Sequence, residues 1–176
     1  MTIAELRERL SGRIHENDIL EMLYYKQECP EIADALYGYM FDNDTKVASN
    51  ALWVQTWDLI DRTLPYRDNL VTLAITTHST TIRRLALTLL ERMDWSKSDI
   101  RTDFLNFCME RILSQAEPPG VRALCIKLGY QQCRHYPELI DELKLLLDSL
   151  SEMPITPAIT SARKNVLKKL HLLNLR

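Results

Sequence analysis

Apolar residues recur at intervals of three, four and seven positions along almost the whole chain. This is the period of a helix with one apolar face, since about 3.6 residues complete a turn. No segment alternates apolar and polar residues cleanly enough to predict a strand. Prolines and short polar caps separate the periodic segments. The pattern predicts an all-α protein with helices near residues 3–11, 17–27, 30–41, 44–62, 65–77, 79–93, 98–115, 119–135, 136–150 and 156–173.

Four of these segments resemble one another: KVASNALWVQTWDL, TIRRLALTLLERM, GVRALCIKLGYQQC and PAITSARKNVLKKL. They align on Val47, Ile82, Val121 and Ala158. Four residues later each copy has a small residue, namely Ala51, Ala86, Cys125 and Ala162. Amphipathicity requires an apolar residue there but not a small one, so we expect a neighbouring helix to approach closely. The copies start 35, 39 and 37 residues apart with one further helix between them, which indicates a two-helix repeat.

The repeated helix resembles the second helix of a HEAT repeat, a member of the armadillo-type class of helical repeats. In that family an aspartate-to-valine turn opens the helix, and a basic and a small residue follow. Here the first copy has Asp44 and Val47, and the next two have Arg83 and Arg122 after the branched residue.

The resemblance implies a right-handed α-α superhelix, an ARM/HEAT-like solenoid of about four helix pairs over residues 30–173. Residues 1–29 would form an N-terminal helical cap. The chain length of 176 residues suits one domain with a continuous apolar core, so we expect a single α-solenoid domain over 1–176.

Charge divides by helix type, although the net charge of the chain is only −2. The four expected first helices hold ten acidic and four basic residues, a net charge of −6, and the four second helices hold four acidic and twelve basic residues, a net charge of +8. In the resembled family the second helices line the concave side. A basic concave face that binds an acidic protein segment or a polyanion would then include Arg83, Arg84, Arg122, Lys127, Lys164 and Lys168. The alternative is that these charges only stabilise helix stacking or are solvated.

An aromatic and acidic patch is expected in the first repeat, from Trp53, Trp57 and Asp58. Tryptophans spaced by four residues form a stripe, which more often packs between helices than binds a ligand. HEAT-like solenoids also include DNA glycosylases of the alkylation-repair type, which use a basic channel with tryptophans and an aspartate. A nucleic-acid-processing enzyme of that type is therefore the alternative to a binding module.

A second, fainter enzyme signal is the stretch SEMPITPAITSARKN, which resembles the signature loop of adenylosuccinate lyases through Ser151, Met153 and Pro154. The lysine and Asn-Pro of that loop are absent and the chain is far shorter than that fold, so we set lyase activity aside.

The remaining composition argues against several classes of site. The four cysteines form no C-x-x-C pair and no histidine lies at metal-finger spacing, so we expect reduced, mostly buried thiols, no metal and no cofactor. No apolar run approaches the roughly 20 residues of a membrane span. We therefore predict a cytoplasmic, non-catalytic interaction module whose partner is a protein, or else a nucleic acid, with no membrane partner.

Overall fold

The computed structural model describes residues 1–173, and every regular element in that range is helical. The first five helices are α1 (Ile3–Ser11), α2 (Glu16–Glu28), α3 (Pro30–Tyr39), α4 (Thr45–Gln55) and α5 (Arg67–Thr76). The next five are α6 (Thr80–Arg92), α7 (Thr102–Leu113), α8 (Pro119–Cys133), α9 (Pro137–Ser149) and α10 (Pro157–Leu173). The prediction of an all-α protein is confirmed, and nine of the ten helices begin within two residues of the predicted position.

Two helices, α4 and α7, are shorter than predicted by more than one turn. The segment expected at 44–62 ends as an α-helix at Gln55 and continues through turns into a 3₁₀ helix at Ile60–Arg62. The segment expected from residue 98 starts at Thr102, because Ser96 and Asp99 form a capping box around a separate 3₁₀ turn, Lys97–Asp99. In both places the apolar period of the sequence extends beyond the end of the helix, because local hydrogen bonds turn the backbone out of the helical path.

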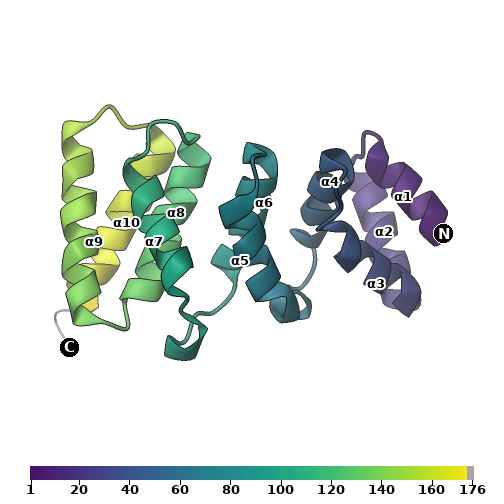
Figure 1. The fold of residues 1–176 in the computed structure, drawn as a ribbon, viewed down its shortest axis with the longest axis horizontal. Helices are drawn as coiled ribbons and strands as arrows, with labels where there is room; N and C mark the ends of the chain where they lie inside the picture. Colours follow the sequence, from purple (N-terminus) through teal and green to yellow (C-terminus); the bar gives the residue numbers. More distant parts are fainter. Residues whose placement is uncertain (174–176) are drawn as a thin grey trace. The chain divides into compact units, whose positions relative to one another are not determined.

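The chain divides into two compact units, Met1–Leu89 and the part from Leu90 onward, with the boundary inside α6. In the first unit α1 packs against α3 and α4, and α2 packs against α3 and α4 (Figure 1). Asn50 of α4 secures this packing: its buried amide donates to the carbonyls of Leu10 and Gly12, at 2.8 and 2.9 Å. These two carbonyls lie in and directly after the last turn of α1, where backbone acceptors lack intrahelical partners.

In the second unit α8 is the central helix and contacts α7, α9 and α10 (Figure 1). Trp95, in the segment before α7, is fully buried and stacks on Phe104 with ring centroids 5.4 Å apart. Its indole nitrogen donates to the carbonyl of Leu90 at 2.9 Å, so the polar atom of the ring is satisfied in the core.

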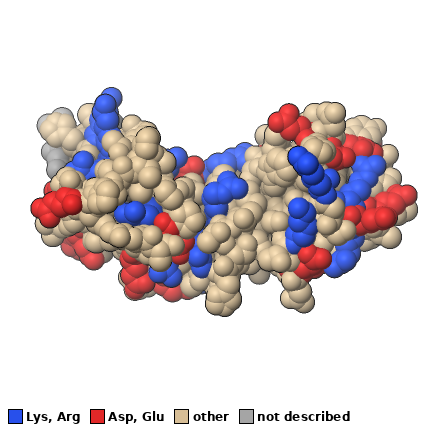
Figure 2. Space-filling model, turned by 90° about the horizontal axis from the view of Figure 1, so that it is seen from above, with Lys and Arg blue, Asp and Glu red and all other residues tan. Residues whose placement is uncertain are grey.

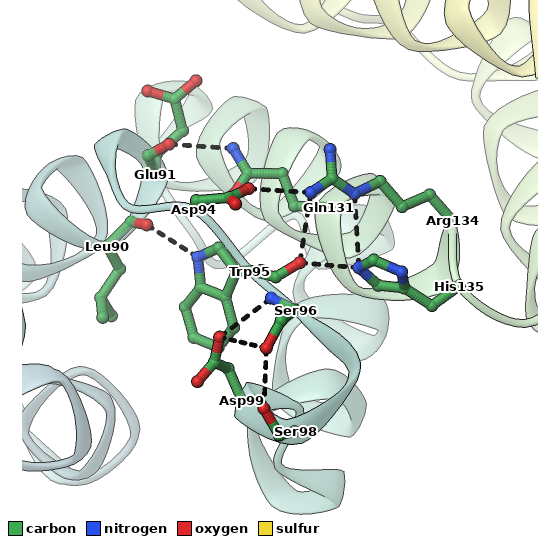
Figure 3. A network of polar contacts seen from close by, with 10 residues as sticks. All are labelled: Leu90, Glu91, Asp94, Trp95, Ser96, Ser98, Asp99, Gln131, Arg134 and His135. Atoms are coloured by element: carbon green, nitrogen blue, oxygen red, sulfur yellow. Dashed lines mark hydrogen bonds and ion pairs between the residues drawn. The ribbon is translucent and has the colours of Figure 1, made fainter.

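Polar contacts fasten this segment to the end of α8 (Figure 3). Arg134 donates to the carboxylate of Asp94 at 2.9 Å and to the carbonyl of Trp95 at 3.2 Å. Nε2 of His135 lies 2.6 Å from the same carbonyl, which requires a hydrogen on Nε2. That nitrogen cannot then accept from Arg134 Nε, 3.4 Å away, so the contact with Trp95 is the one that holds the ring. His135 therefore has a structural role at a helix end.

The repeated small residues are buried: Ala51, Ala86 and Cys125 have no exposed surface and Ala162 has 2%. The first residues of the aligned stretches agree less well. Val47, Ile82 and Val121 are buried, but Ala158 is exposed. The fourth copy therefore departs from the alignment at its start.

Within residues 1–173 no helix combines the length and the apolar character needed to cross a membrane.

Candidate interaction grooves

Arg83 and Arg122, two residues expected on the binding face, are buried instead, with 9% and 5% of their surface exposed. Nε of Arg83 donates to the carbonyl of Ala74, near the C-terminus of α5, at 3.1 Å. Nε of Arg122 donates to the carbonyl of Ile112, near the C-terminus of α7, at 3.0 Å. Each guanidinium thus satisfies an orphan acceptor and opposes the negative end of the preceding helix dipole. We remove both residues from the expected binding face, because their cationic groups face the helix pair and not solvent.

Arg163 makes the same contact in the last helix pair: its Nε donates to the carbonyl of Leu147, near the C-terminus of α9, at 2.6 Å. It is therefore the structural counterpart of Arg83 and Arg122, although the sequence alignment pairs those residues with position 159. The exposure of Ala158 agrees with this shift of one helical turn, which places the buried Ala162 at the first position of the repeat and Val166 at the position expected to be small. Three of the twelve cations on the second helices are thus explained by helix capping.

When Arg163 is aligned with Arg83 and Arg122, the other four cations predicted on the binding face form two pairs at equivalent positions of the repeat. Arg84 and Lys164 each directly follow a capping arginine, and both are exposed. Lys127 and Lys168 each come five residues after one, and their side chains line the same hollow between α8 and α10. These residues carry part of the charge that α6, α8 and α10 present to solvent.

We call the hollow between α8 and α10 the lysine groove; its volume is about 440 Å³. Its α8 side and the end of α6 contribute Glu91, Lys127, Tyr130 and Gln131. Its α10 side contributes Asn165, Val166, Lys168, Lys169 and Leu172. The whole groove belongs to the second unit.

Two contacts organise the lysine groove. Nζ of Lys169 lies 5.4 Å from the centroid of the Tyr130 ring, a cation–π contact that joins α10 to α8. Nζ of Lys127 lies 3.5 Å from a carboxylate oxygen of Glu91, and the Lys127 side chain is 44% exposed. Three ammonium groups against one carboxylate leave the groove with a net charge of +2. This arrangement can hold carboxylate or phosphate oxygens.

A second hollow, the tryptophan groove, lies between α4 and α6 in the first unit and has a volume of about 390 Å³. Trp53 and Arg84 line it together with hydroxyl, amide and apolar side chains: Ser49, Asn50, Thr56, Thr81, Leu85 and Thr88. No carboxylate is among these lining residues. The tryptophan groove can therefore stack a planar or apolar group beside one guanidinium.

Asp58 does not join Trp53 in that groove, because its carboxylate is buried against α2. Nζ of Lys26 donates to Asp58 and to the side-chain carbonyl of Gln55, both at 2.6 Å, and lies 4.0 Å from the centroid of the Tyr37 ring. The expected patch of Trp53, Trp57 and Asp58 is thus divided: Trp53 lines a groove, Trp57 is exposed after α4, and Asp58 is buried.

Burial and ion pairing act in opposite directions on the pKa values of this buried pair. Burial acts to raise the pKa of Asp58, but the hydrogen bonds from Lys26 and from the Leu59 amide, together with the charges of Lys26 and Arg62, lower it below its usual value. Burial lowers the pKa of Lys26, and Asp58 offsets part of that effect. Burial also raises the pKa of Tyr37 to about 12, with a smaller contribution from the charge of Asp58. The geometry is that of a structural clamp between α2 and the end of α4.

A larger hollow of about 620 Å³ lies between α1 and α2, and four of its charged side chains are already engaged. Glu5 accepts from the Thr2 amide, Asp18 accepts from the His15 amide, and Glu21 pairs with Arg9. These contacts are helix caps and a surface ion pair, so we do not treat this hollow as the functional site.

The cysteines behave as expected from the sequence: Cys108, Cys125 and Cys133 are buried thiols and Cys29 is partly exposed. Burial raises the pKa of Cys133 to about 12 and, with the adjacent Cys125, raises that of Cys108. Thiols with raised pKa values are poor nucleophiles. In residues 1–173 no group of three or more His, Cys, Asp or Glu side chains could hold a metal ion.

Sequence reasoning missed Tyr130, Lys169 and Leu172 in the lysine groove. The spacing of Lys127 and Tyr130, three residues apart on one helix, placed them on one face. Their pairing with α10 depends on the register of that helix, which the alignment set one turn too early.

A sequence profile of the HEAT repeat domain matches residues 6–170 of the chain. The chain is a HEAT repeat protein. With its helices in successive pairs, it has the fold class of an α-α solenoid, as the resemblance implied. The match also covers α2 and most of α1, the helices expected to form a cap. No curated protein and no solved structure matches this HEAT repeat protein.

Proposed function

We propose that this HEAT repeat protein is a non-catalytic interaction module that binds an acidic segment of another protein through the exposed cations of its second helices. HEAT repeats form helical scaffolds that typically serve protein interaction. The observation that carries the proposal is the lysine groove, where three ammonium groups face one carboxylate. The expected cytoplasmic location stays a prediction.

Charge on the second helices supports this proposal only after the structural cations are set aside. Arg83, Arg122 and Arg163 cap helices, and Arg134 pairs with Asp94. In the second unit Lys164 and Lys168 are exposed and remain to bind an anionic partner. Figure 2 shows that basic and acidic side chains are interspersed on the face it draws, so a local groove and not a uniform basic surface supports the proposal.

The glycosylase alternative depended on a tryptophan beside a carboxylate. Trp53 lines a groove without a carboxylate, and Asp58 is paired with Lys26 at 2.6 Å. We therefore propose no glycosylase chemistry for these residues.

A charge-reversal titration tests the proposal. A labelled glutamate-rich peptide, single-stranded and duplex DNA, and RNA would each be titrated with the wild type and with a Lys164→Glu, Lys168→Glu variant at two salt concentrations. The matched control is Lys97→Glu, Lys144→Glu, which changes the net charge equally; Lys97 contacts the Tyr136 ring and Lys144 pairs with Asp141.

We expect the peptide to bind the wild type and the control, and the Lys164, Lys168 variant to bind it about tenfold more weakly. If a nucleic acid binds more tightly than the peptide, the partner is a polyanion and not an acidic protein segment. Absence of binding to every probe at low salt would contradict the proposal.

A further inference from the structure

The lysine groove is not purely ionic. Leu172 lines it with 53% of its surface exposed, next to the ammonium groups of Lys168 and Lys169 on the same helix. An exposed leucine alone needs no explanation. Here, however, it lies within a groove that also includes the aliphatic stems of three lysines and the small exposed part of Tyr130, which is 9% exposed.

Resting on the proposed function, we infer that the lysine groove binds an acidic protein segment carrying an apolar side chain between its carboxylates. The carboxylates contact the rim formed by Lys127, Lys168 and Lys169, and the apolar side chain covers Leu172 beside Tyr130. A segment of charged residues alone, or a phosphate backbone, would leave Leu172 in water and gain nothing from it.

The charges of the groove favour this class of partner. Lys127 forms an ion pair with Glu91 at 3.5 Å, and the ammonium group of Lys169 lies over the Tyr130 ring. Both ammonium groups are therefore held in place by contacts within the groove. Lys168 is exposed and forms no ion pair within residues 1–173. A ligand carboxylate therefore meets one available ammonium and two that are positioned by the fold.

The amides of the groove suit a peptide backbone. Gln131 already donates to the carbonyl of Glu91 at 2.9 Å, which orients its side chain (Figure 3). Asn165 is exposed on the opposite helix and can both donate to and accept from a peptide group. A groove of about 440 Å³ is large enough for a few side chains, within the range of about 300–1,000 Å³ that is usual for ligand clefts.

Fluorescence anisotropy with two labelled peptides tests the inference. Both peptides carry the same number of glutamates; one has leucines between them and the other has serines. They would be titrated with the wild type, with Leu172→Ser, and with Leu145→Ser as the matched control, because Leu145 is an exposed leucine of α9 outside the groove. Circular dichroism would check that all three proteins fold.

We expect the wild type to bind the leucine peptide about three- to tenfold more tightly than the serine peptide, since partial burial of a leucine contributes that much. Leu172→Ser should remove this difference and Leu145→Ser should keep it. Equal binding of both peptides by the wild type, or an equal effect of the two substitutions, would overturn the inference while leaving the proposed charge-driven binding intact. If neither peptide binds, the proposed function itself fails.

Discussion

At the scale of single residues, neighbouring arginines of the same helix have opposite roles. Arg83 is buried and donates to the carbonyl of Ala74, whereas Arg84 is exposed and lines the tryptophan groove. Both belong to the string TIRRLALTLL and carry the same charge. Only the direction of each side chain from the helix decides which one stabilises the fold and which one is available to a partner.

We predict that Arg83→Met lowers the free energy of unfolding by about 2–3 kcal/mol, because a buried carbonyl loses a charged donor. Arg84→Met should change it by less than about 0.5 kcal/mol, as is usual for exposed positions. Urea unfolding of both variants measures the difference. Similar losses in the two variants would contradict the capping role of Arg83.

The buried pair of Lys26 and Asp58 also acts at the residue scale. We expect Lys26→Met to destabilise the protein by up to about 3–5 kcal/mol, because the buried carboxylate of Asp58 loses its 2.6 Å contact with Lys26 and keeps only the longer, 3.4 Å contact with the partly exposed Arg62. A double variant, Lys26→Met with Asp58→Leu, should recover most of this loss, since no unpaired charge remains. Thermal or urea unfolding would measure both, and a double variant no more stable than Lys26→Met would count against the clamp.

The same pair predicts a dependence of stability on pH. The folded-state pKa of Asp58 is lowered, so its contribution is complete above the unfolded-state value of about 3.9 and is lost as the pH falls through the folded-state value. Between pH 5 and pH 3 the wild type should therefore lose more stability than the Lys26→Met, Asp58→Leu variant. Parallel curves for the two proteins would show that Asp58 contributes nothing to the acid sensitivity.

At the scale of helices, the small position of the repeat controls close packing. Ala86 is fully buried on α6, and enlarging it forces neighbouring side chains from their preferred rotamers. We predict that Ala86→Leu destabilises the fold by about 1–3 kcal/mol. The matched control is Ala158→Leu on α10, where the side chain is exposed. An unchanged melting temperature for Ala86→Leu would contradict the assignment of this position to a close helix contact.

Helix ends and register were less predictable than helix identity. The apolar period runs through WVQTWDLID, yet α4 ends at Gln55, and the turn beyond it carries Asp58 to Lys26 of α2. The register of α10 follows from the contact between Arg163 and the carbonyl of Leu147 on α9. Both features depend on partners at least 16 residues away in the sequence, which a local pattern does not contain.

For the molecule as a whole, the net charge of −2 conceals a local excess of cations on the second helices. We predict that the association rate with a glutamate-rich peptide falls steeply as salt rises, whereas the dissociation rate changes little, because exposed charges act mainly on the encounter. Stopped-flow fluorescence at several salt concentrations measures both rates, with an uncharged peptide of equal length as the control. A salt-independent association rate would exclude electrostatic attraction as the basis of recognition.

The sequence by itself determined the helical class and the pairing of helices, because the apolar period, the proline breaks and the small residues are local features with direct physical meaning. Its charge count also located an excess of cations on the second helices. Tertiary structure alone decided which cations are available: the carbonyls at the ends of α5, α7 and α9 engage Arg83, Arg122 and Arg163, while Lys127, Lys168 and Lys169 meet Tyr130 and Leu172 in one groove. A residue's charge is set by its chemistry, but whether that charge faces a helix end or a partner depends on contacts that only the folded chain brings together.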